Sequence, residues 1–317
     1  MILHFLYTGS EKGGVQIWGK NLAKTVNTVV TCSFTAGAIE RDYINKKLTF
    51  QKFSLNIFKN KRVIICSDFR AILIGAILTF FLNRGAKLFF IIHSNRKKVL
   101  DFPVMLIAKI LRPNAYFLAT TKEQIQQFKL LRFNTNLISL SSKRRELNYK
   151  KLRFQSSKNL MFFGRLSPEK KVELLIPEIK KNMDYNLYIF GDGDTEYVNK
   201  LMLNNINISI NIGWFDMFDV IESYKIGYII VPNAYEGISL VSIEAIFNGI
   251  IPICRQDSAF STLNLPEAVR WKDDEDLSNV MTRIKDIGEE LIFLECLNGI
   301  KKYYKNSINI KDLIGAK

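Results

Sequence analysis

The chain has 317 residues, of which 48% are hydrophobic and 24% charged, and it contains only 7 prolines. This composition excludes a disordered or fibrous protein, and the length predicts two domains rather than one. The net charge of +15 is divided unevenly, because residues 1–154 contain 27 Lys and Arg against 7 Asp and Glu, whereas residues 155–317 contain 18 against 23.

Short apolar runs alternate with amphipathic segments along the first half of the chain. Strands are predicted at residues 2–7, 29–31, 63–66, 87–93 and 115–119, and helices at residues 15–26, 69–83 and 99–111. This alternation predicts βαβ units in a parallel, doubly wound sheet. The longest apolar stretch, residues 71–82, is shorter than the roughly 20 residues that a membrane-spanning helix needs, so no spanning helix is expected.

The same pattern restarts after a basic, irregular stretch at residues 141–157. Strands are predicted at residues 159–163, 185–190, 206–212, 227–231 and 251–254, and helices at residues 171–181, 195–204, 218–224 and 240–248. We therefore expect an α/β protein with two Rossmann-like domains, residues 1–150 and 151–317. The helical tail from residue 277 need not belong wholly to the second domain. Ligands bind open α/β sheets at the carboxyl ends of strands, so functional residues are expected in the loops that follow strands.

A cationic loop follows the predicted strand at residues 159–163. Gly164 lets the backbone leave the strand in a tight turn, and both Arg165 and Lys170 can reach one point above the strand end. Two cations at such a point suit a diphosphate, since Arg binds phosphate oxygens through two hydrogen bonds and Lys acts as a point charge. The alternative is an ordinary polar loop before a helix, with its basic residues in solvent.

A second strand–loop–helix segment covers residues 232–245. Its loop carries Glu236 and Gly237, and a helix is predicted to begin near Ser239, where free backbone amides favour an anion. Glu244 lies within this helix among apolar residues, where a carboxylate is costly to bury without a partner. Glu244 therefore either faces solvent or accepts hydrogen bonds from ligand hydroxyls, such as those of a ribose.

These residues resemble the motifs of a known family. Glu236 and Glu244, with seven residues between them, resemble the E-x7-E motif of retaining GT-B glycosyltransferases of family 4, the glycosyl transferases group 1. Residues 163–170 look like the phosphate-binding strand-loop of that family. The resemblance is strong over residues 159–255 and weaker in the first half. It implies the GT-B fold, in which two Rossmann-like domains face a central cleft, the first for the acceptor and the second for the donor.

The resemblance implies a role for each of these positions. Arg165 and Lys170 would bind the pyrophosphate of a nucleotide-sugar donor and neutralise the leaving nucleoside diphosphate. Glu236 would face the donor sugar, and Glu244 would bind the ribose hydroxyls. The positions expected to contact the donor are Gly13, Gly14, Gly191, Gly213, Gly237, Ile238, Ser239, Leu240 and Glu244. Such enzymes need no metal or other cofactor, and UDP is the expected nucleotide because it is frequent in the family.

Two further candidates lie in the first half. Gly13 and Gly14 occupy the first strand-to-helix loop, but the full GxGxxG pattern of a dinucleotide site is missing. The resemblance implies that this backbone approaches the donor or the acceptor, and the alternative is an ordinary glycine turn. His93 ends a predicted strand and is a candidate catalytic residue in contact with the donor sugar or acceptor, although a lone histidine is more often structural. His4, inside the first strand, is interpreted as structural.

No metal or disulfide site is predicted. The four cysteines are far apart in the sequence and have no CxxC pair or flanking histidines, which favours reduced thiols. Asp192 and Asp194 have the spacing of a DxD metal motif, but they lie where the family has a glycine-rich turn.

The basic first half favours a polyanionic partner. Residues 95–113 combine basic and apolar side chains in a pattern that is typical of an amphipathic helix at an anionic membrane surface. Basic clusters at residues 143–145 and 150–153 add to this charge, and each Lys or Arg near an anionic leaflet contributes ~1 kcal/mol. The alternative is a core-facing helix with a solvated basic face.

We therefore expect a glycosyltransferase that moves a hexose or N-acetylhexosamine from a UDP-sugar to a lipid-linked glycan. It would be peripheral on the cytoplasmic membrane face and serve bacterial surface polysaccharide or lipopolysaccharide biosynthesis. One alternative is a soluble glycosyltransferase with a free sugar or glucan as acceptor. A second is a nucleic-acid-binding protein, although the sequence has no helix-turn-helix, zinc-finger or RNA-recognition motif. A third is an inactive scaffold of the same fold. The presence of all four charged site residues, Arg165, Lys170, Glu236 and Glu244, argues against it.

Overall fold

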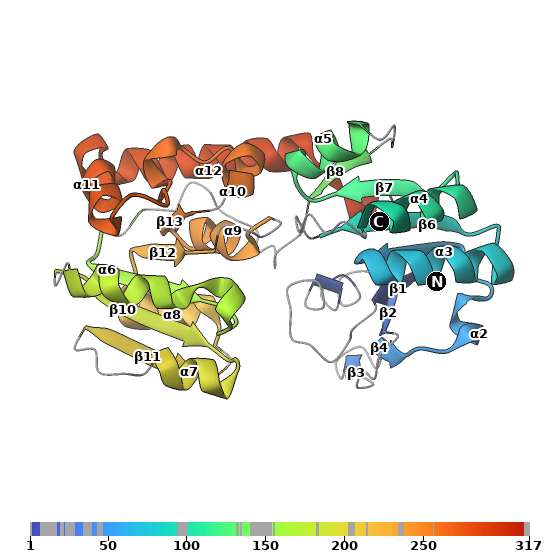
Figure 1. Ribbon diagram of the computed structural model, residues 1–317, viewed down its shortest axis with the longest axis horizontal. Coiled ribbons are helices and arrows are strands. Elements are labelled where there is room, and N and C mark those ends of the chain that lie inside the picture. Colours follow the sequence, from blue (N-terminus) through green and yellow to red (C-terminus); the bar gives the residue numbers. More distant parts are fainter. Residues whose placement is uncertain are drawn as a thin grey trace. The chain divides into compact units, whose positions relative to one another are not determined.

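The computed structural model divides the chain into two compact units (Figure 1). Unit 1 comprises Met1–Lys143 and Asn306–Lys317, and unit 2 comprises Arg144–Lys305. The structure describes residues 2–6, 18–19, 22, 29–33, 40–42, 47–93, 101–130, 133, 135–139, 154, 156–181, 184–201, 207–213, 215–233, 238–255 and 257–313. Each unit has its own sheet.

Unit 1 is built on a nine-stranded sheet. Its strands are β1 (Ile2–Leu6), β2 (Val29–Ser33), β3 (Glu40–Asp42), β4 (Lys47–Lys52), β5 (Val63–Ser67), β6 (Lys87–Ile92), β7 (Tyr116–Ala119), β8 (Thr135–Ser139) and β14 (Ile308–Asn309). In the order β14-β8-β7-β6-β5-β1-β2-β4-β3, neighbouring strands are parallel except for β3 and β4. The chain thus returns to unit 1 near its end, where the Ser139 hydroxyl donates to the Ile308 carbonyl at 3.3 Å.

Helices α3 and α4 pack against each other on this sheet. The helices of unit 1 are α2 (Leu55–Phe58), α3 (Phe69–Leu82), α4 (Asp101–Leu111), α5 (Lys122–Leu130) and α13 (Ile310–Leu313). α3 approaches β5 closely at Gly75, where an added Cβ would lie 2.3 Å from the Cys66 sulfur. The core below it is aromatic and aliphatic, and Phe5, Ile64 and Phe90 are fully buried in it. Strands buried on both faces explain the near-continuous apolar runs of the sequence.

Arg112 ties the ends of α3 and α4 together. Its guanidinium donates hydrogen bonds of 2.8–3.2 Å to the carbonyl oxygens of Thr79, Asn83, Arg84 and Ala86. These carbonyls lie in the last turn of α3 and just beyond it, and those of Thr79 and Asn83 also accept backbone amides. Arg112 belongs to the basic segment at residues 95–113, but its half-buried side chain is used for contacts within unit 1.

Unit 2 is built on a five-stranded sheet in which all neighbouring strands are parallel. Its strands are β9 (Asn159–Phe163), β10 (Asn186–Gly191), β11 (Ile208–Ile212), β12 (Tyr228–Val231) and β13 (Ile251–Cys254), in the order β11-β10-β9-β12-β13. Its helices are α6 (Leu175–Lys181), α7 (Thr195–Leu201), α8 (Met217–Tyr224), α9 (Leu240–Phe247), α10 (Asp257–Leu263), α11 (Leu277–Ile287) and α12 (Glu289–Asn306), with 3-10 turns η1 (Pro168–Lys170), η2 (Val172–Leu174) and η3 (Glu267–Val269). None of the described helices in either unit combines the length and apolar character that crossing a bilayer requires.

The expected mixed α/β architecture with parallel sheets is confirmed. The strands predicted at residues 159–163 and 251–254 have the observed bounds. Four strands were not predicted, namely β3, β4 and β8, which carry polar residues, and β14, which has two residues. The helix predicted from residue 171 begins later, at Leu175. The reason is Lys171, whose left-handed backbone (φ 52, ψ 38) separates η1 from η2.

The chain order of unit 2 creates a switch point beside β9. From β9 the chain continues to β10 and β11 on one side and then crosses to β12 and β13 on the other side. In open α/β sheets, ligands bind outside the carboxyl ends of the strands at such a point. The loops after β9 and β12 therefore flank the expected binding position. In unit 1 the same reversal occurs at β1, between β2 and β5.

Backbone contacts continue past the ends of β9 and β10. The Leu166 amide donates to the Asp192 carbonyl at 3.0 Å. The two loops approach this closely because glycines stand opposite the other backbone. An added Cβ at Gly191 would lie 1.8 Å from the Gly164 carbonyl oxygen, and one at Gly193 would lie 1.9 Å from the Leu166 carbonyl oxygen. No side chain fits at either position without moving a loop.

We predict that Gly191→Ala lowers the free energy of unfolding by about 2 kcal/mol, because the new methyl group meets rigid backbone rather than a flexible side chain. Gly85→Ala is the matched control, since no atom lies within 4 Å of an added Cβ there. Urea titrations followed by circular dichroism would compare both variants with the wild type. Equal stability of the two variants would contradict the close backbone contact.

Candidate functional site

Arg165 is presented at the carboxyl edge of the unit 2 sheet. Gly164, with φ 152, turns the chain out of β9, and Leu166 behind it is fully buried. Arg165 between them is exposed, so its guanidinium stands at the edge while its neighbours fix the backbone. Within the described part of the chain, this guanidinium forms no hydrogen bond or ion pair. It is therefore available to an anionic ligand.

Lys170 stands at the end of η1, on the same loop. Its amide donates to the Ser167 carbonyl at 2.9 Å, which closes the turn, and its side chain is half-buried. Shortly afterwards the Val172 amide donates to the Tyr197 hydroxyl at 3.0 Å, which ties the loop to α7. Both bases of the loop thus stand on a backbone that is held on two sides, by β10 and by α7.

The start of α9 is capped by Ser239. The Ser239 hydroxyl oxygen accepts the Ser242 amide at 3.2 Å and the Ser242 hydroxyl at 2.8 Å. The Ser242 hydroxyl also lies 3.4 Å from the Cys254 sulfur at the end of β13, and burial raises the pKa of that thiol to about 12. Helix geometry leaves the amides of Leu240 and Val241 without helical acceptors. These two amides, at the positive end of the helix dipole, remain for an anion.

Glu244 lies one turn beyond the start of α9 and is half-buried. Its neighbours Ile243 and Ala245 are fully buried, whereas Leu240, four residues before it, is also half-buried. Residues four apart share a helix face, and helical side chains lean toward the N-terminus. The carboxylate therefore lies on the face that leads to the start of α9. Ile238, before the cap, is buried and contributes its side chain to the core.

Gly191 and Gly213 have steric roles at the same edge. The Gly213 amide donates to the Gly191 carbonyl at 2.9 Å, and Gly213 has φ 143, which residues with a Cβ rarely adopt. With Gly164, they form a row of glycines at the ends of β9, β10 and β11. The described contacts of this row are between backbones, and a contact with a donor stays a prediction.

In unit 1, His93 follows β6 at the carboxyl edge. Its ring lies 5.4 Å from that of Trp18, which in turn lies 5.2 Å from the ring of His4. Burial lowers the pKa of His93 to about 3, and burial together with the charge of His93 lowers the pKa of His4 to about 3, so both rings are neutral at neutral pH. His4 is held by the hydroxyls of Ser67 at 2.8 Å and Thr31 at 3.3 Å. In the described chain, Nε2 of His93 is buried without a partner.

Two residues that the sequence analysis does not select also lie at carboxyl edges. Asp68 follows β5 with φ 81 and ψ 155, a backbone region that is nearly confined to glycine, and its carboxylate caps α3 by accepting the Ala71 amide at 2.9 Å. Arg255 follows β13, with its guanidinium 4.7 Å above the Trp271 ring and paired with Asp273. Their place just after predicted strands could have identified both.

The aspartates of the Asp192–Asp194 segment serve local structure. The Asp192 carboxylate accepts the Gly193 amide at 3.0 Å, and the Asp194 carboxylate accepts the Tyr197 amide at 2.9 Å at the start of α7. Among the residues that the structure describes, no group of three or more His, Cys, Asp and Glu side chains could hold a metal ion. The four cysteines are free and buried.

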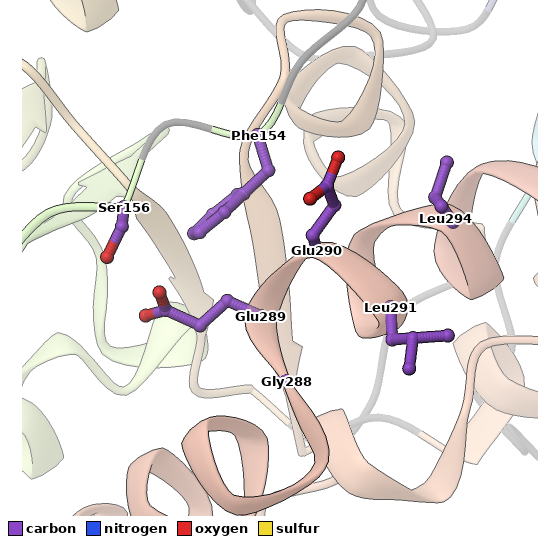
Figure 2. A pocket seen from close by; sticks show the side chains of 7 residues that line it. All are labelled: Phe154, Ser156, Gly288, Glu289, Glu290, Leu291 and Leu294. Carbon is purple, nitrogen blue, oxygen red and sulfur yellow. The ribbon is translucent and has the colours of Figure 1, made fainter.

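A hollow of about 600 Å³ lies around the start of α12 in unit 2 (Figure 2). Its lining consists of Phe154, Ser156, Gly288, Glu289, Glu290, Leu291 and Leu294. Among these described lining residues there are two carboxylates and no Lys or Arg. The Glu289 carboxylate accepts a hydrogen bond from the Tyr228 hydroxyl. A diphosphate is disfavoured beside two carboxylates. The hollow also contains none of the candidate residues, so it is not the candidate site.

The described candidates fall into two groups. Arg165, Lys170, Gly191, Gly213 and the start of α9 gather at the carboxyl edge of unit 2, whereas His93 belongs to unit 1. The remaining expected site residues lie outside the described residues, and they are Gly13, Gly14, Glu236 and Gly237. Of the E-x7-E pair, the structure therefore describes only the second glutamate.

One family model matches the chain. Residues 143–286, less than half of the chain, match the glycosyl transferases group 1. This segment includes the cationic loop after β9 and the whole of α9. No curated protein sequence matches the chain.

Several solved structures are similar to the chain over nearly its whole length. Anabaena HepE in complex with UDP has a TM-score of 0.74 and 16% identity, over 96% of this chain and 95% of that chain. Sucrose-phosphate synthase from Thermosynechococcus elongatus has a TM-score of 0.70 and 13% identity, over 96% and 94% of the two chains. The trehalose 6-phosphate synthase of Burkholderia multivorans has a TM-score of 0.63 and 10% identity, over 95% and 93%.

At these identities, the likeness shows the fold. The fold is that of the GT-B glycosyltransferases, in agreement with the fold class expected from the sequence. Together with this fold, the match of residues 143–286 to the glycosyl transferases group 1 supports a glycosyltransferase enzyme, as the sequence predicts.

Proposed function

We propose that this protein is a retaining glycosyltransferase that transfers a hexose or N-acetylhexosamine from a UDP-sugar to a lipid-linked glycan. Its setting would be bacterial surface polysaccharide or lipopolysaccharide biosynthesis, at the cytoplasmic face of the membrane. Binding of a nucleotide-sugar donor is supported above all by the Arg165 guanidinium, which is exposed and unpaired on the fixed loop at the switch point of unit 2. The retaining part rests on the resemblance of Glu236 and Glu244 to the E-x7-E motif.

Similarity to HepE supports UDP as the nucleotide of the donor. Its solved structures contain UDP, UDP and glucose, or UDP-glucose. In the present chain, the cationic loop and the start of α9 follow the neighbouring strands β9 and β12 and offer the positive groups that a diphosphate requires.

In this proposal the cationic loop acts on the leaving group. When the bond between the donor sugar and the diphosphate breaks, the diphosphate gains negative charge, which Arg165 and Lys170 offset. The amides of Leu240 and Val241 add the positive end of the α9 dipole. These groups stabilise the leaving group without a metal ion.

The other proposed contacts are with hydroxyl groups. Glu244 accepts hydrogen bonds from the ribose, and His93, being neutral, exchanges one hydrogen bond with a hydroxyl of the donor sugar or acceptor through its unpartnered Nε2. Glu236 faces the donor sugar. Gly13, Gly14 and Gly237 stay proposed backbone contacts of the donor or acceptor.

The lipid-linked acceptor is proposed on the charge of the chain. Residues 1–154 carry a net charge of +20, and a membrane rich in anionic lipid attracts such a surface. A soluble enzyme with a free sugar acceptor is the second candidate, and the similarity to sucrose-phosphate synthase and trehalose 6-phosphate synthase favours it. Vesicle binding distinguishes the two, because a polar acceptor gives no reason for membrane attachment.

We predict that UDP alone, among UDP, GDP, ADP, CMP and dTDP, raises the melting temperature of the protein by mass action. Glu244→Ala should weaken UDP binding about tenfold or more, because charged hydrogen bonds to the ribose are lost. Glu222→Ala, which removes an exposed glutamate from α8, is the matched control. UDP affinity that is equal in both variants would remove Glu244 from the donor site.

We predict that Arg165→Ala slows transfer about a hundredfold, with a smaller change in UDP affinity, because the charge it offsets develops as the donor bond breaks. Release of UDP from UDP-glucose in the presence of a glycan acceptor would measure the rate. Arg165→Lys keeps the positive charge and should recover part of the rate. An Arg165→Ala variant with the turnover of the wild type would exclude this residue from leaving-group stabilisation.

We predict that charge reversal to Glu at Lys97, Lys98 and Lys109 reduces binding to anionic vesicles and spares UDP binding, because each base near an anionic leaflet contributes ~1 kcal/mol. Only Lys109 of these three lies within the described residues. The same charge reversal at Lys301, Lys302 and Lys305 in α12 is the control, and it should have little effect. Cosedimentation with vesicles measures the bound fraction of each variant. An equal loss of vesicle binding in both variants would contradict a specific role of the first half.

A further inference from the structure

We infer that the outer faces of α3 and α4 form an apolar patch that inserts into an anionic lipid bilayer. This inference deepens the membrane part of the proposed function and rests on it. It goes beyond the amphipathic helix expected at residues 95–113, because the contact includes α3, which the sequence pattern does not implicate, and is assigned to particular exposed apolar side chains of both helices.

Five large apolar side chains of α3 and α4 are exposed, and we call them the α3–α4 patch. Phe81 and Ile110 are 74% and 70% exposed, and Ile77, Leu106 and Ile107 are between 39% and 44% exposed. Ile77 and Phe81 lie four residues apart on α3 and therefore share a face. Leu106 and Ile107 lie four and three residues before Ile110 and do the same on α4. Each helix thus presents an apolar stripe to solvent.

The two stripes lie side by side. α3 and α4 connect consecutive parallel strands, so right-handed crossovers bring both helices to the same face of the sheet, where they pack against each other (Figure 1). Arg112, just after α4, donates to the carbonyls of Thr79 and Asn83 at 3.0 and 3.2 Å. The last turns of the two helices, with Phe81 and Ile110, therefore lie together. Exposed apolar side chains that gather on two neighbouring helices indicate an interaction site.

The surroundings of the patch are basic. The described residues 55–93 and 101–130, which include both helices, contain 10 Lys and Arg but only 3 Asp and Glu. The Arg84 guanidinium, just after α3, lies 4.3 Å from the centre of the Phe80 ring, and the Lys87 ammonium lies 5.0 Å from the centre of the Tyr116 ring, so both positive charges stand over aromatic side chains. Apolar side chains within a basic surface match an interface with anionic lipid.

The same charge argues against a second copy of this chain as the occupant of the patch. A symmetric dimer would bring the same basic surface of each subunit together, and like charges in such a contact oppose association. An anionic bilayer offers both parts of the required chemistry, an apolar interior and negative headgroups.

The position of the patch determines which edge of the unit 1 sheet faces the bilayer. The last turns of α3 and α4 reach the edge where Lys87 begins β6, whereas His93 follows β6 at the opposite, carboxyl edge. A bilayer at the patch therefore leaves the carboxyl edge uncovered. That edge stays accessible to a glycan whose lipid end lies in the same membrane.

The test compares two double variants of the full chain on vesicles of phosphatidylcholine mixed with phosphatidylglycerol. Phe81→Ser with Ile110→Ser removes the two most exposed apolar side chains of the patch, and we expect about tenfold weaker partition into the vesicles. Leu291→Ser with Leu294→Ser is the matched control, since these leucines of α12 are 57% and 45% exposed in unit 2. The control should bind vesicles as the wild type does. An unchanged thermal shift with UDP shows that the variants are folded and keep the donor site.

A second measurement reports insertion directly. Phe81→Trp should give an emission shift to shorter wavelength on vesicles and quenching by brominated lipid, because the indole enters the acyl region. Leu291→Trp should give neither change. Absence of both effects at position 81 would overturn the inference.

The remaining outcomes separate the inference from the proposed function. Vesicle binding that survives the Phe81→Ser, Ile110→Ser change but is lost on charge reversal at Lys97, Lys98 and Lys109 would overturn the patch and leave the proposed function standing. A dimer in sedimentation velocity that dissociates in the double serine variant, without vesicle binding by the wild type, would assign the patch to a second copy and overturn the inference. Failure of UDP to stabilise the wild type would instead count against the proposed donor.

Discussion

The close contact between two loop backbones at the carboxyl edge of unit 2 is the constraint on which the candidate donor site depends. The Leu166 amide reaches the Asp192 carbonyl only because Gly191 and Gly193 carry no Cβ. This contact leaves Arg165 little backbone freedom while its guanidinium stays exposed. A cation that is already in position does not have to be reorganised when negative charge develops on a leaving group, and such preorganisation is a main source of electrostatic catalysis.

The glycines of this edge show where sequence reasoning stops. The sequence of unit 2 predicts the strands well, because buried parallel strands are nearly continuous apolar runs. It also shows glycines just after three of those strands, at positions 164, 191 and 213. Whether a ligand or another backbone lies against Gly191 depends on β9, which comes from another part of the chain, so the local pattern cannot decide it. The structure identifies the Gly164 carbonyl as that neighbour.

Unit 1 was less predictable, because its details depend on contacts between distant segments. Ile308 of β14 pairs with Ile138 of β8, about half the chain length away, and a strand of two residues gives no periodic pattern. Arg112 looks like a solvated base on an amphipathic helix, yet carbonyls at the end of α3 are its partners. α3 is apolar on all sides, so its sequence cannot show which face is exposed. Only packing against the sheet and α4 shows that Phe81 remains outside.

The two proposed binding events, to a bilayer and to the donor, depend on electrostatic interactions of different range, because charge is divided unevenly along the chain. A bilayer responds to the summed charge of the first half, a net of +20, together with the apolar side chains that enter it. The donor is also an anion, but the second half carries a net of −5, so its attraction must come from groups in direct contact. Salt screens interactions beyond about 8 Å at physiological ionic strength and affects contact pairs much less. In the proposed function, donor binding therefore depends on Arg165, Lys170 and the α9 amides, whereas membrane attachment depends on the summed charge of residues 1–154 and on the α3–α4 patch.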